Sequence, residues 1–304
     1  MTRYSRVLFL LLCLQGSATR LNSQETSPTF LLPMKATMVT AWDYPLNPLT
    51  DSSLDAHPEA ETIRLGFNMF LHTQREAPLY SPNGLSCNNC HLNAGQKEGA
   101  MPLVGVAKVF PEYNKRSGKE FTLEDRIVGC FQRSQNATGG IACGEDLPPR
   151  ESREVSSLAA YIRWISSLVG TALPWRGKNV IARENLIPLE KLSLEKGKRL
   201  FLEKCISCHG EDGQGVDIGD KRAGPLWGLY SWNDGAGAAR VYTLAGMIRY
   251  AMPYLDPGSL TDEEALQIAN FICSQPRPVF PYKIADYNEE PLPVDAVYYM
   301  RNKK

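Results

Sequence analysis

Apolar residues recur every three or four positions in several separate stretches of the chain, which is the spacing of amphipathic helices. The stretches 122–134, 193–204 and 242–251 also have the pattern of helices. Short helices separated by loops that contain glycine and proline predict a mainly α protein. The clearest helical faces are formed by Ile63, Phe67, Phe70 and Leu71; by Leu158, Ile162, Ile165 and Leu168; and by Leu266, Ala269 and Ile272.

Residues typical of helix ends support several of these boundaries. Thr122 and Thr261 are each followed by acidic residues within the first turn, which predicts that each threonine caps a helix. Pro253 follows the stretch 242–251 closely and predicts its end, because the residue before a proline disfavours helical geometry. In the helix over 193–204, the residues expected to face inward are Leu194, Leu200 and Phe201.

Two C-x-x-C-H motifs carry the most specific chemistry in the chain. Two thiols three positions apart can each add to a vinyl group of one haem, and the adjacent histidine then binds the iron. A shared zinc site is the alternative, but Cys90 and Cys205 are 115 residues apart, against about 15–20 in zinc ribbons. The motifs therefore predict two covalently bound haem c groups, held by Cys87, Cys90 and His91 and by Cys205, Cys208 and His209.

The length of 304 residues and the distance between the motifs predict two cytochrome c-type domains, each with one covalent haem. In each half a helix precedes the haem motif, and a ligand loop and a further helix follow it. The predicted order is a signal peptide over 1–18, an N-terminal arm over 19–53, a first domain over 54–173, a linker over 174–190, a second domain over 191–280 and a C-terminal tail over 281–304.

The first eighteen residues resemble a leader for export. Arg3 and Arg6 precede an apolar run over 7–14, and small residues at 16–18 offer a cleavage site. Cys13 leaves a lipoprotein anchor as the alternative, although Leu12 before it is large for such a cleavage site. Covalent haem attachment of this type takes place outside the cytoplasm, so we expect a periplasmic protein without a transmembrane segment. Equal numbers of basic and acidic residues, 33 each, argue against a nucleic-acid partner.

The sixth ligand of each iron separates an electron carrier from an enzyme. In the second domain, Met252 lies 43 residues after His209, directly before Pro253, where the chain can turn the thioether toward the haem. Met247 is the competing candidate, but a position inside the helix suits core packing better. Methionine ligation raises the reduction potential, so we expect the second haem to pass electrons out.

In the first domain the favoured distal ligand is Cys130. It lies 39 residues after His91 on a predicted helix, with Arg126 four positions before it and Ser134 four after it, so the three share one face. The positive charge of an arginine stabilises a thiolate. The alternatives are Met101 or His72 as ligand, or a disulfide between Cys130 and Cys143, while Cys273 has no predicted role.

Three sequence blocks resemble the dihaem thiosulfate dehydrogenases, which are also described as tetrathionate reductases. The resemblance covers residue 60 to the C-terminus, and its most specific block surrounds Cys130. The blocks are Gly-Leu-Ser-Cys-Asn-Asn-Cys-His-Leu-Asn-Ala-Gly (84–95), Glu-Asp-Arg-Ile-Val-Gly-Cys-Phe-Gln-Arg-Ser-Gln-Asn (124–136) and Asn-Asp-Gly-Ala-Gly (233–237).

The resemblance implies a separate role and ligand set for each haem. The first haem would have His91 and Cys130 as ligands and would carry the active site, with Arg116, Arg126 and Ser134 as anion-binding groups. The second haem would have His209 and Met252 as ligands. Some family members have a lysine directly before that methionine as an alternative ligand, and the residue here is Ala251, which argues against a ligand switch.

Thiosulfate is a small dianion, and arginine forks suit the binding of such groups. Coupling two thiosulfates releases two electrons, which matches two one-electron haems. We therefore predict a periplasmic enzyme that interconverts thiosulfate and tetrathionate and exchanges electrons with a soluble or membrane-linked cytochrome c. The alternatives are a cytochrome that conjugates thiosulfate to a carrier protein and a pure dihaem electron-transfer cytochrome; a dihaem peroxidase fits less well.

Overall fold

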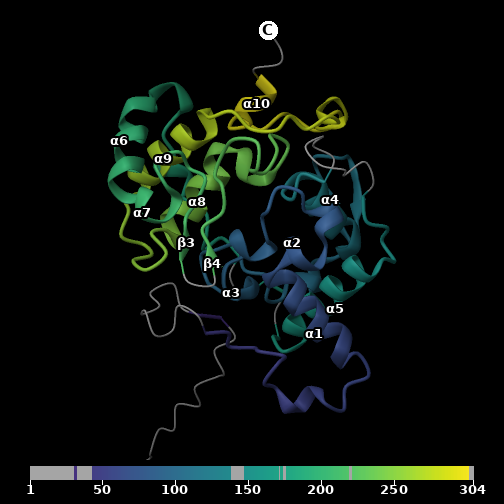
Figure 1. Ribbon diagram of the computed structural model, residues 1–304. Coiled ribbons are helices and arrows are strands. Elements are labelled where there is room, and N and C mark those ends of the chain that lie inside the picture. The colour runs from purple at the N-terminus through teal and green to yellow at the C-terminus, as the bar shows by residue number, and fades with distance from the viewer. Residues whose placement is uncertain are drawn as a thin grey trace, which may run out of the picture.

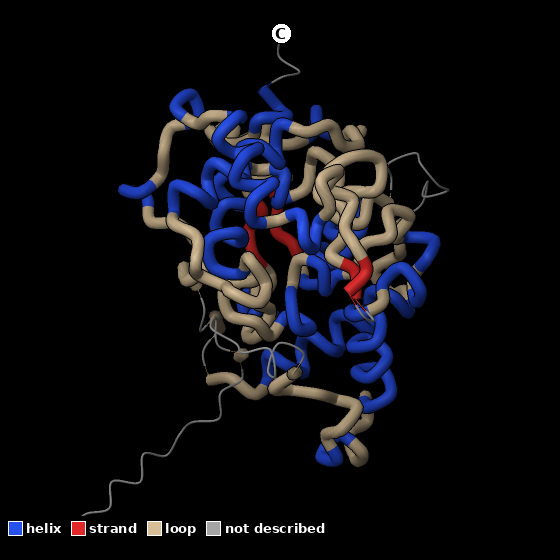
Figure 2. The backbone as a smooth tube through the Cα atoms, turned by 60° about the vertical axis from the view of Figure 1, so that its left-hand side comes forward, coloured by secondary structure: helices blue, strands red, loops and turns tan. Residues whose placement is uncertain are grey.

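The structure is a computed structural model, which describes residues 31–32, 43–137, 147–170, 172–173, 176–218 and 221–300. The predicted signal peptide (1–18) and Cys143 lie outside the described residues. Helices and loops make up most of the described chain, and its strands form two short antiparallel hairpins (Figure 2). The strands are β1 (Glu112–Asn114) with β2 (Lys119–Phe121), and β3 (Asp217–Ile218) with β4 (Lys221–Arg222).

Every helix predicted from the sequence is present, which confirms the mainly α class. The helices are α1 (Ala60–Leu71), α2 (Thr73–Glu76), α3 (Leu92–Gly95), α4 (Leu123–Arg133), α5 (Arg153–Ser167), α6 (Leu194–Lys204), α7 (Ile206–His209), α8 (Val241–Ala251), α9 (Asp262–Ser274) and α10 (Val297–Met300).

The predicted threonine caps are confirmed. The hydroxyl oxygen of Thr122 accepts from the backbone of Asp125, and the Asp125 carboxylate accepts from the backbone of Thr122. Thr261 and Glu264 repeat this reciprocal arrangement at the start of α9. The expectation that Leu194 faces inward is wrong: it is the first residue of α6, and its side chain is 51% exposed.

Each half of the molecule is built on one close crossing of two helices (Figure 1). Gly66 brings α1 against α5, and a Cβ at this position would lie 1.9 Å from the carbonyl oxygen of Ser157. Gly197 brings α6 against α9 in the same way, since a Cβ would lie 2.2 Å from the carbonyl oxygen of Gln267. Only glycine permits these approaches. Two separate hydrophobic cores surround the two crossings.

The two halves pack directly against each other. A small cluster of buried residues joins the loop after the first C-x-x-C-H motif to α8 and its end; it consists of Leu92, Ala100, Met247 and Ala251, with Met101, Met252 and Tyr254 packed against it. The chain after α9 then returns from the second half and runs over the first, toward α4 (Figure 1). No helix in the described part of the chain is long and apolar enough to cross a membrane.

A buried lysine lies at this contact between the halves. Lys97 has no exposed surface, and its Nζ donates to the carbonyl oxygen of Tyr254 at 3.2 Å and lies 4.0 Å from the centre of that ring. The Tyr254 hydroxyl in turn donates to Oδ1 of Asn93 at 3.0 Å. Burial lowers the pKa of Lys97 from its ordinary 10.5 to about 8, because the ammonium loses its hydration.

Lys97 should make the free energy of unfolding depend on pH at alkaline pH values. Between about pH 8 and pH 10.5 the unfolded chain binds the proton more tightly than the folded one, so folded stability rises with pH in this window. We expect the free energy of unfolding of Lys97→Met to exceed that of the wild type by about 3 kcal/mol at most at pH 7. This difference should shrink toward pH 10, where the wild-type lysine is neutral in the folded state. Unfolding midpoints at the two pH values measure this difference.

The control is Lys198→Met, which removes an exposed lysine of α6. Its effect should be small and the same at both pH values. A Lys97→Met difference that does not change with pH would contradict the assignment of a depressed pKa to this lysine.

Candidate active site

A cavity of about 960 Å³ is lined by every site residue predicted for the first domain. Its volume lies in the range of protein cavities that bind cofactors. Apolar side chains form much of its wall, and the thiols of Cys87, Cys90 and Cys130 and the imidazole of His91 also line it, so the residues fit a large flat apolar cofactor attached through sulfur. The apolar part of the wall includes Phe70, Leu103, Val106, Phe110, Ile127 and Leu158.

The first C-x-x-C-H motif lies on one side of this cavity. Cys87 begins a single helical turn that the Ser86 and Asn89 side chains cap reciprocally, and Cys90 ends it. His91 Nδ1 lies 2.6 Å from the carbonyl oxygen of Met101. A carbonyl only accepts hydrogen bonds, so Nδ1 carries the hydrogen and the lone pair of Nε2 is left for a metal ion.

Burial and charge keep His91 neutral. Burial lowers the pKa of this imidazole, the Met101 carbonyl raises it, and the positive charge of Arg126 lowers it again. Burial also raises the pKa of the Cys87 thiol to about 12 and that of Cys90 to about 11. These two half-buried thiols therefore lie in an apolar environment, which is where thioether links to a cofactor would lie.

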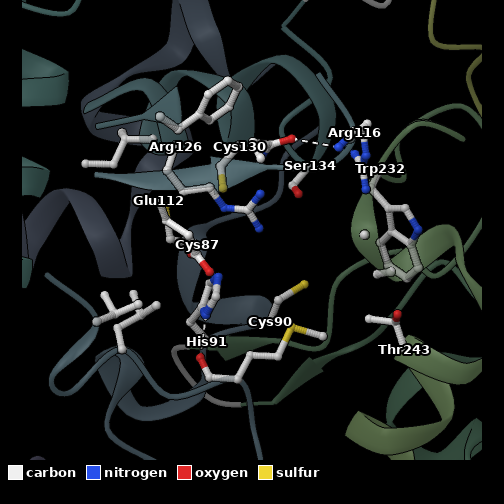
Figure 3. A pocket seen from close by; sticks show the side chains of 18 of the residues that line it. Cys87, Cys90, His91, Glu112, Arg116, Arg126, Cys130, Ser134, Trp232 and Thr243 are labelled. Atoms are coloured by element: carbon white, nitrogen blue, oxygen red, sulfur yellow. Dashed lines mark hydrogen bonds between the residues drawn. The ribbon is translucent and has the colours of Figure 1, made fainter. Parts of the chain in front are cut away.

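Helix α4 forms the opposite side of the cavity (Figure 3). Arg126, Cys130 and Ser134 all line it, as their common spacing of four predicted. Cys130 is a half-buried free thiol, so it is not in a disulfide. The Arg126 guanidinium points into the space between α4 and His91 and makes no ion pair or hydrogen bond with any described residue.

Arg116 comes from the turn between β1 and β2 and lines the same cavity. Its Nη1 donates to the carbonyl oxygen of Gly235 at 2.5 Å, and its Nε donates to the Tyr287 hydroxyl at 3.3 Å. Burial lowers the pKa of Arg116, but Tyr287, Tyr299 and Asp286 more than offset this and raise it overall. This guanidinium is therefore a fixed cation at the wall of the cavity.

The second half of the molecule completes the cavity wall with Trp232, Arg240 and Thr243. Beside them, Asn233 caps the end of α4: its backbone N–H donates to the Arg133 carbonyl at 3.1 Å and its side chain to the Gln132 carbonyl at 3.0 Å. Carbonyl groups at a helix end have no intrahelical partner, so this loop satisfies them.

Sequence reasoning missed the structural role of this loop and of Arg133. The run Asn-Asp-Gly-Ala-Gly (233–237) was part of the family resemblance, and this was the only signal for it. Arg133 lies in the last turn of α4, and its guanidinium donates to the Gly235 carbonyl at 3.1 Å and to both carboxylate oxygens of Asp286 at 2.7 Å. Asp286 lies 153 residues away in the sequence, which no local pattern could reveal.

The second C-x-x-C-H motif directly follows α6 and spans α7, from Cys205 at its N-cap to His209, its last residue. Burial raises the pKa of the Cys205 thiol to about 12 and lowers that of His209. Helix α8 ends at Ala251, as predicted from Pro253, and Met252 is its C-terminal cap. The Met252 side chain packs against the same core as Cys205. Cys273 is buried within that core on α9.

Comparisons with known proteins agree with this arrangement. A family model described as "SoxA/TsdA, cytochrome c domain" matches residues 79–169, and one described as "Cytochrome C oxidase, cbb3-type, subunit III" matches residues 193–272. The chain is 35% identical to a thiosulfate dehydrogenase of Stutzerimonas stutzeri over 237 residues, which are 77% of this chain and 73% of the relative. It is 36% identical to that of Allochromatium vinosum over 232 residues, which are 72% and 80% of the two chains.

The chain belongs to the thiosulfate dehydrogenase family. Among solved structures, it resembles the thiosulfate dehydrogenase TsdBA of Marichromatium purpuratum in its as-isolated form, with a TM-score of 0.70 and 31% identity. That match covers 81% of this chain and 54% of the other, so the chain spans about half the length of that protein. As in this thiosulfate dehydrogenase family, the two cytochrome c domains carry two covalently bound haem c groups.

The cap from Asn233 should matter for the stability of this thiosulfate dehydrogenase homologue. Asn233 is fully buried, and Asn233→Ala leaves the Gln132 carbonyl without its partner, which should cost about 1–3 kcal/mol. We expect a lower unfolding midpoint of the haem-loaded protein. Asn185→Ala, which removes an exposed amide bonded to Asp262, should cost less than about 0.5 kcal/mol. Equal midpoints for the two variants would contradict the importance of this cap.

Proposed function

We propose that the protein oxidises thiosulfate to tetrathionate in the periplasm and also catalyses the reverse reduction. The observation that carries this proposal is the Arg126 guanidinium, which has no partner among the described residues and points into a cavity shared with Cys130 and His91. An unpaired cation beside a thiol in a half-enclosed site suits a small sulfur-containing anion. Membership of the thiosulfate dehydrogenase family supports the same substrate.

The residues that hold the haems are part of this proposal. One haem would be linked through Cys87 and Cys90 and the other through Cys205 and Cys208. The iron would be held by His91 and Cys130 in the first and by His209 and Met252 in the second. Each haem, when bound, accepts and passes on one electron at a time. The first would carry the chemistry, and the second would pass electrons to a soluble or membrane-linked cytochrome c.

Repulsion between the two substrate anions is the main obstacle that the protein must overcome. Two dianions 4 Å apart repel each other by about 16 kcal/mol at an effective dielectric constant of about 20. Arg116 and Arg126 place two positive charges at one cavity and reduce this repulsion. Since the charges are closest when the new bond forms, their effect is larger in the transition state than in either bound thiosulfate alone.

The proposed reaction needs no proton and no oxygen atom. The terminal sulfur atoms of two thiosulfates form one S–S bond, and two electrons leave the substrates. The Cys130 sulfur lies at the cavity wall, and as a ligand of the first iron it would have to leave the iron before it could approach a substrate sulfur. Ser134, one helical turn later, offers a hydroxyl donor to an anion. Arg116 and Arg126 bind and orient the anions throughout.

Loss of the Cys130 sulfur tests this function directly. We expect Cys130→Ser to lose thiosulfate turnover and the low-spin thiolate signal in electron paramagnetic resonance, because a hydroxyl replaces neither the ligand nor the reactive sulfur. Cys143→Ser serves as the matched control and should keep both. Full turnover in Cys130→Ser would rule out the proposed function in this form.

Charge removal at Arg126 should affect binding and catalysis together. We expect Arg126→Gln to raise KM and lower kcat, with a total loss in kcat/KM of about 2–4 kcal/mol, the scale of removing one electrostatic donor from an active site. Arg199→Gln is the control, since Arg199 is an exposed residue of α6 remote from the cavity lining. If kcat/KM is unchanged while the haem spectra are intact, Arg126 has no part in substrate binding.

A further inference from the structure

The segment that follows α9 is more than a tail. Residues 276–298 leave the second half, run over the first half beside α4 and end in α10 (Figure 1). We call residues 276–298 the strap. Glu290, Pro291 and Pro293 of the strap line the cavity described above, together with Tyr287. The strap therefore forms part of the wall of the proposed anion site.

Buried ion pairs hold the strap in place. Both carboxylate oxygens of Asp286 accept from Arg133 at 2.7 Å, and this carboxylate is only 4% exposed. Lys283 pairs with Asp234 at 2.5 Å, and the Phe280 ring lies 4.0 Å from the Arg133 guanidinium. A bidentate pair between an arginine and a carboxylate fixes the direction as well as the distance.

The residue after Asp286 contacts Arg116 at two points. The Tyr287 backbone N–H donates to the Arg116 carbonyl at 2.7 Å, and the Tyr287 hydroxyl accepts from Arg116 Nε at 3.3 Å. Tyr287 has a φ of 58°, in the left-handed region that a bulky residue rarely adopts. Such strain persists only where surrounding contacts enforce it, and it concentrates at functional sites.

These contacts leave Nη2 of the Arg116 guanidinium for a ligand. Nε is bound to Tyr287 and Nη1 to Gly235, whereas Nη2 has no hydrogen-bond partner among the described residues. An arginine side chain has several rotatable bonds, so a free one must lose that freedom when it binds an anion. Fixing the guanidinium beforehand removes this cost from binding.

We propose that Tyr287 is a positioning residue for Arg116, so that the strap holds this cation ready for the substrate dianion. The inference rests on the proposed function, because it assigns Tyr287 to the same anion site. The two arginines of the proposed anion site then depend on three parts of the chain: α4, the turn between β1 and β2, and the strap.

The experiment is a double-mutant cycle with thiosulfate and ferricyanide. Tyr287→Phe keeps the ring and removes only the hydroxyl that accepts from Arg116. We expect it to raise KM about tenfold, the value of one hydrogen bond to a charged group, and to change kcat less. In the Arg116→Gln background the same substitution should change kcat/KM less than about twofold, because its target is gone.

Tyr282→Phe is the matched control. It makes the same change on the same strap, at a tyrosine that is 52% exposed and does not line the cavity, and its kinetics should equal those of the wild type. An unchanged KM in Tyr287→Phe, or the same tenfold rise in the Arg116→Gln background, would overturn the positioning role alone. A wild-type protein without thiosulfate turnover, or wild-type kinetics in Arg116→Gln, would instead overturn the proposed function and this inference with it.

Discussion

The carbonyl oxygen of Gly235 accepts hydrogen bonds from two arginines of the first domain, Arg116 at 2.5 Å and Arg133 at 3.1 Å. Much of the site depends on this contact, because the two guanidinium groups lie close together and repel each other. A shared acceptor and nearby anions offset this repulsion. Asp286 supplies the anion for Arg133. The loop from the second domain and the strap thus fix cations whose side chains belong to the first domain, and neither domain alone provides the complete site.

The same packing brings the two haem sites together. Met101, whose carbonyl holds the His91 imidazole, and Met252 both pack against one small apolar cluster at the domain contact. Lys97 and Tyr254 join the two domains by hydrogen bonds beside that cluster. In the proposed function, electrons that leave the first haem would therefore reach the second through packed protein rather than through solvent.

Local patterns predicted the helices and part of the site. Spacing of four residues placed Arg126, Cys130 and Ser134 on one face of α4, and threonine caps located the starts of α4 and α9. The prediction was wrong for Leu194, since apolar character alone does not tell whether a residue at a helix end is covered. The contact of Arg116 with Tyr287 spans 171 residues and involves irregular chain on both sides, so no periodicity indicates it.

The central claim is that two thiosulfates are joined by a two-electron oxidation in the cavity between the domains. The most direct measurement is the stoichiometry of the purified haem-loaded protein with thiosulfate and ferricyanide, with the sulfur products separated by ion chromatography. The account predicts one ferricyanide reduced for each thiosulfate consumed and one tetrathionate formed from each pair. The account would be contradicted if the product were sulfite or sulfate, or if the protein consumed neither thiosulfate nor ferricyanide.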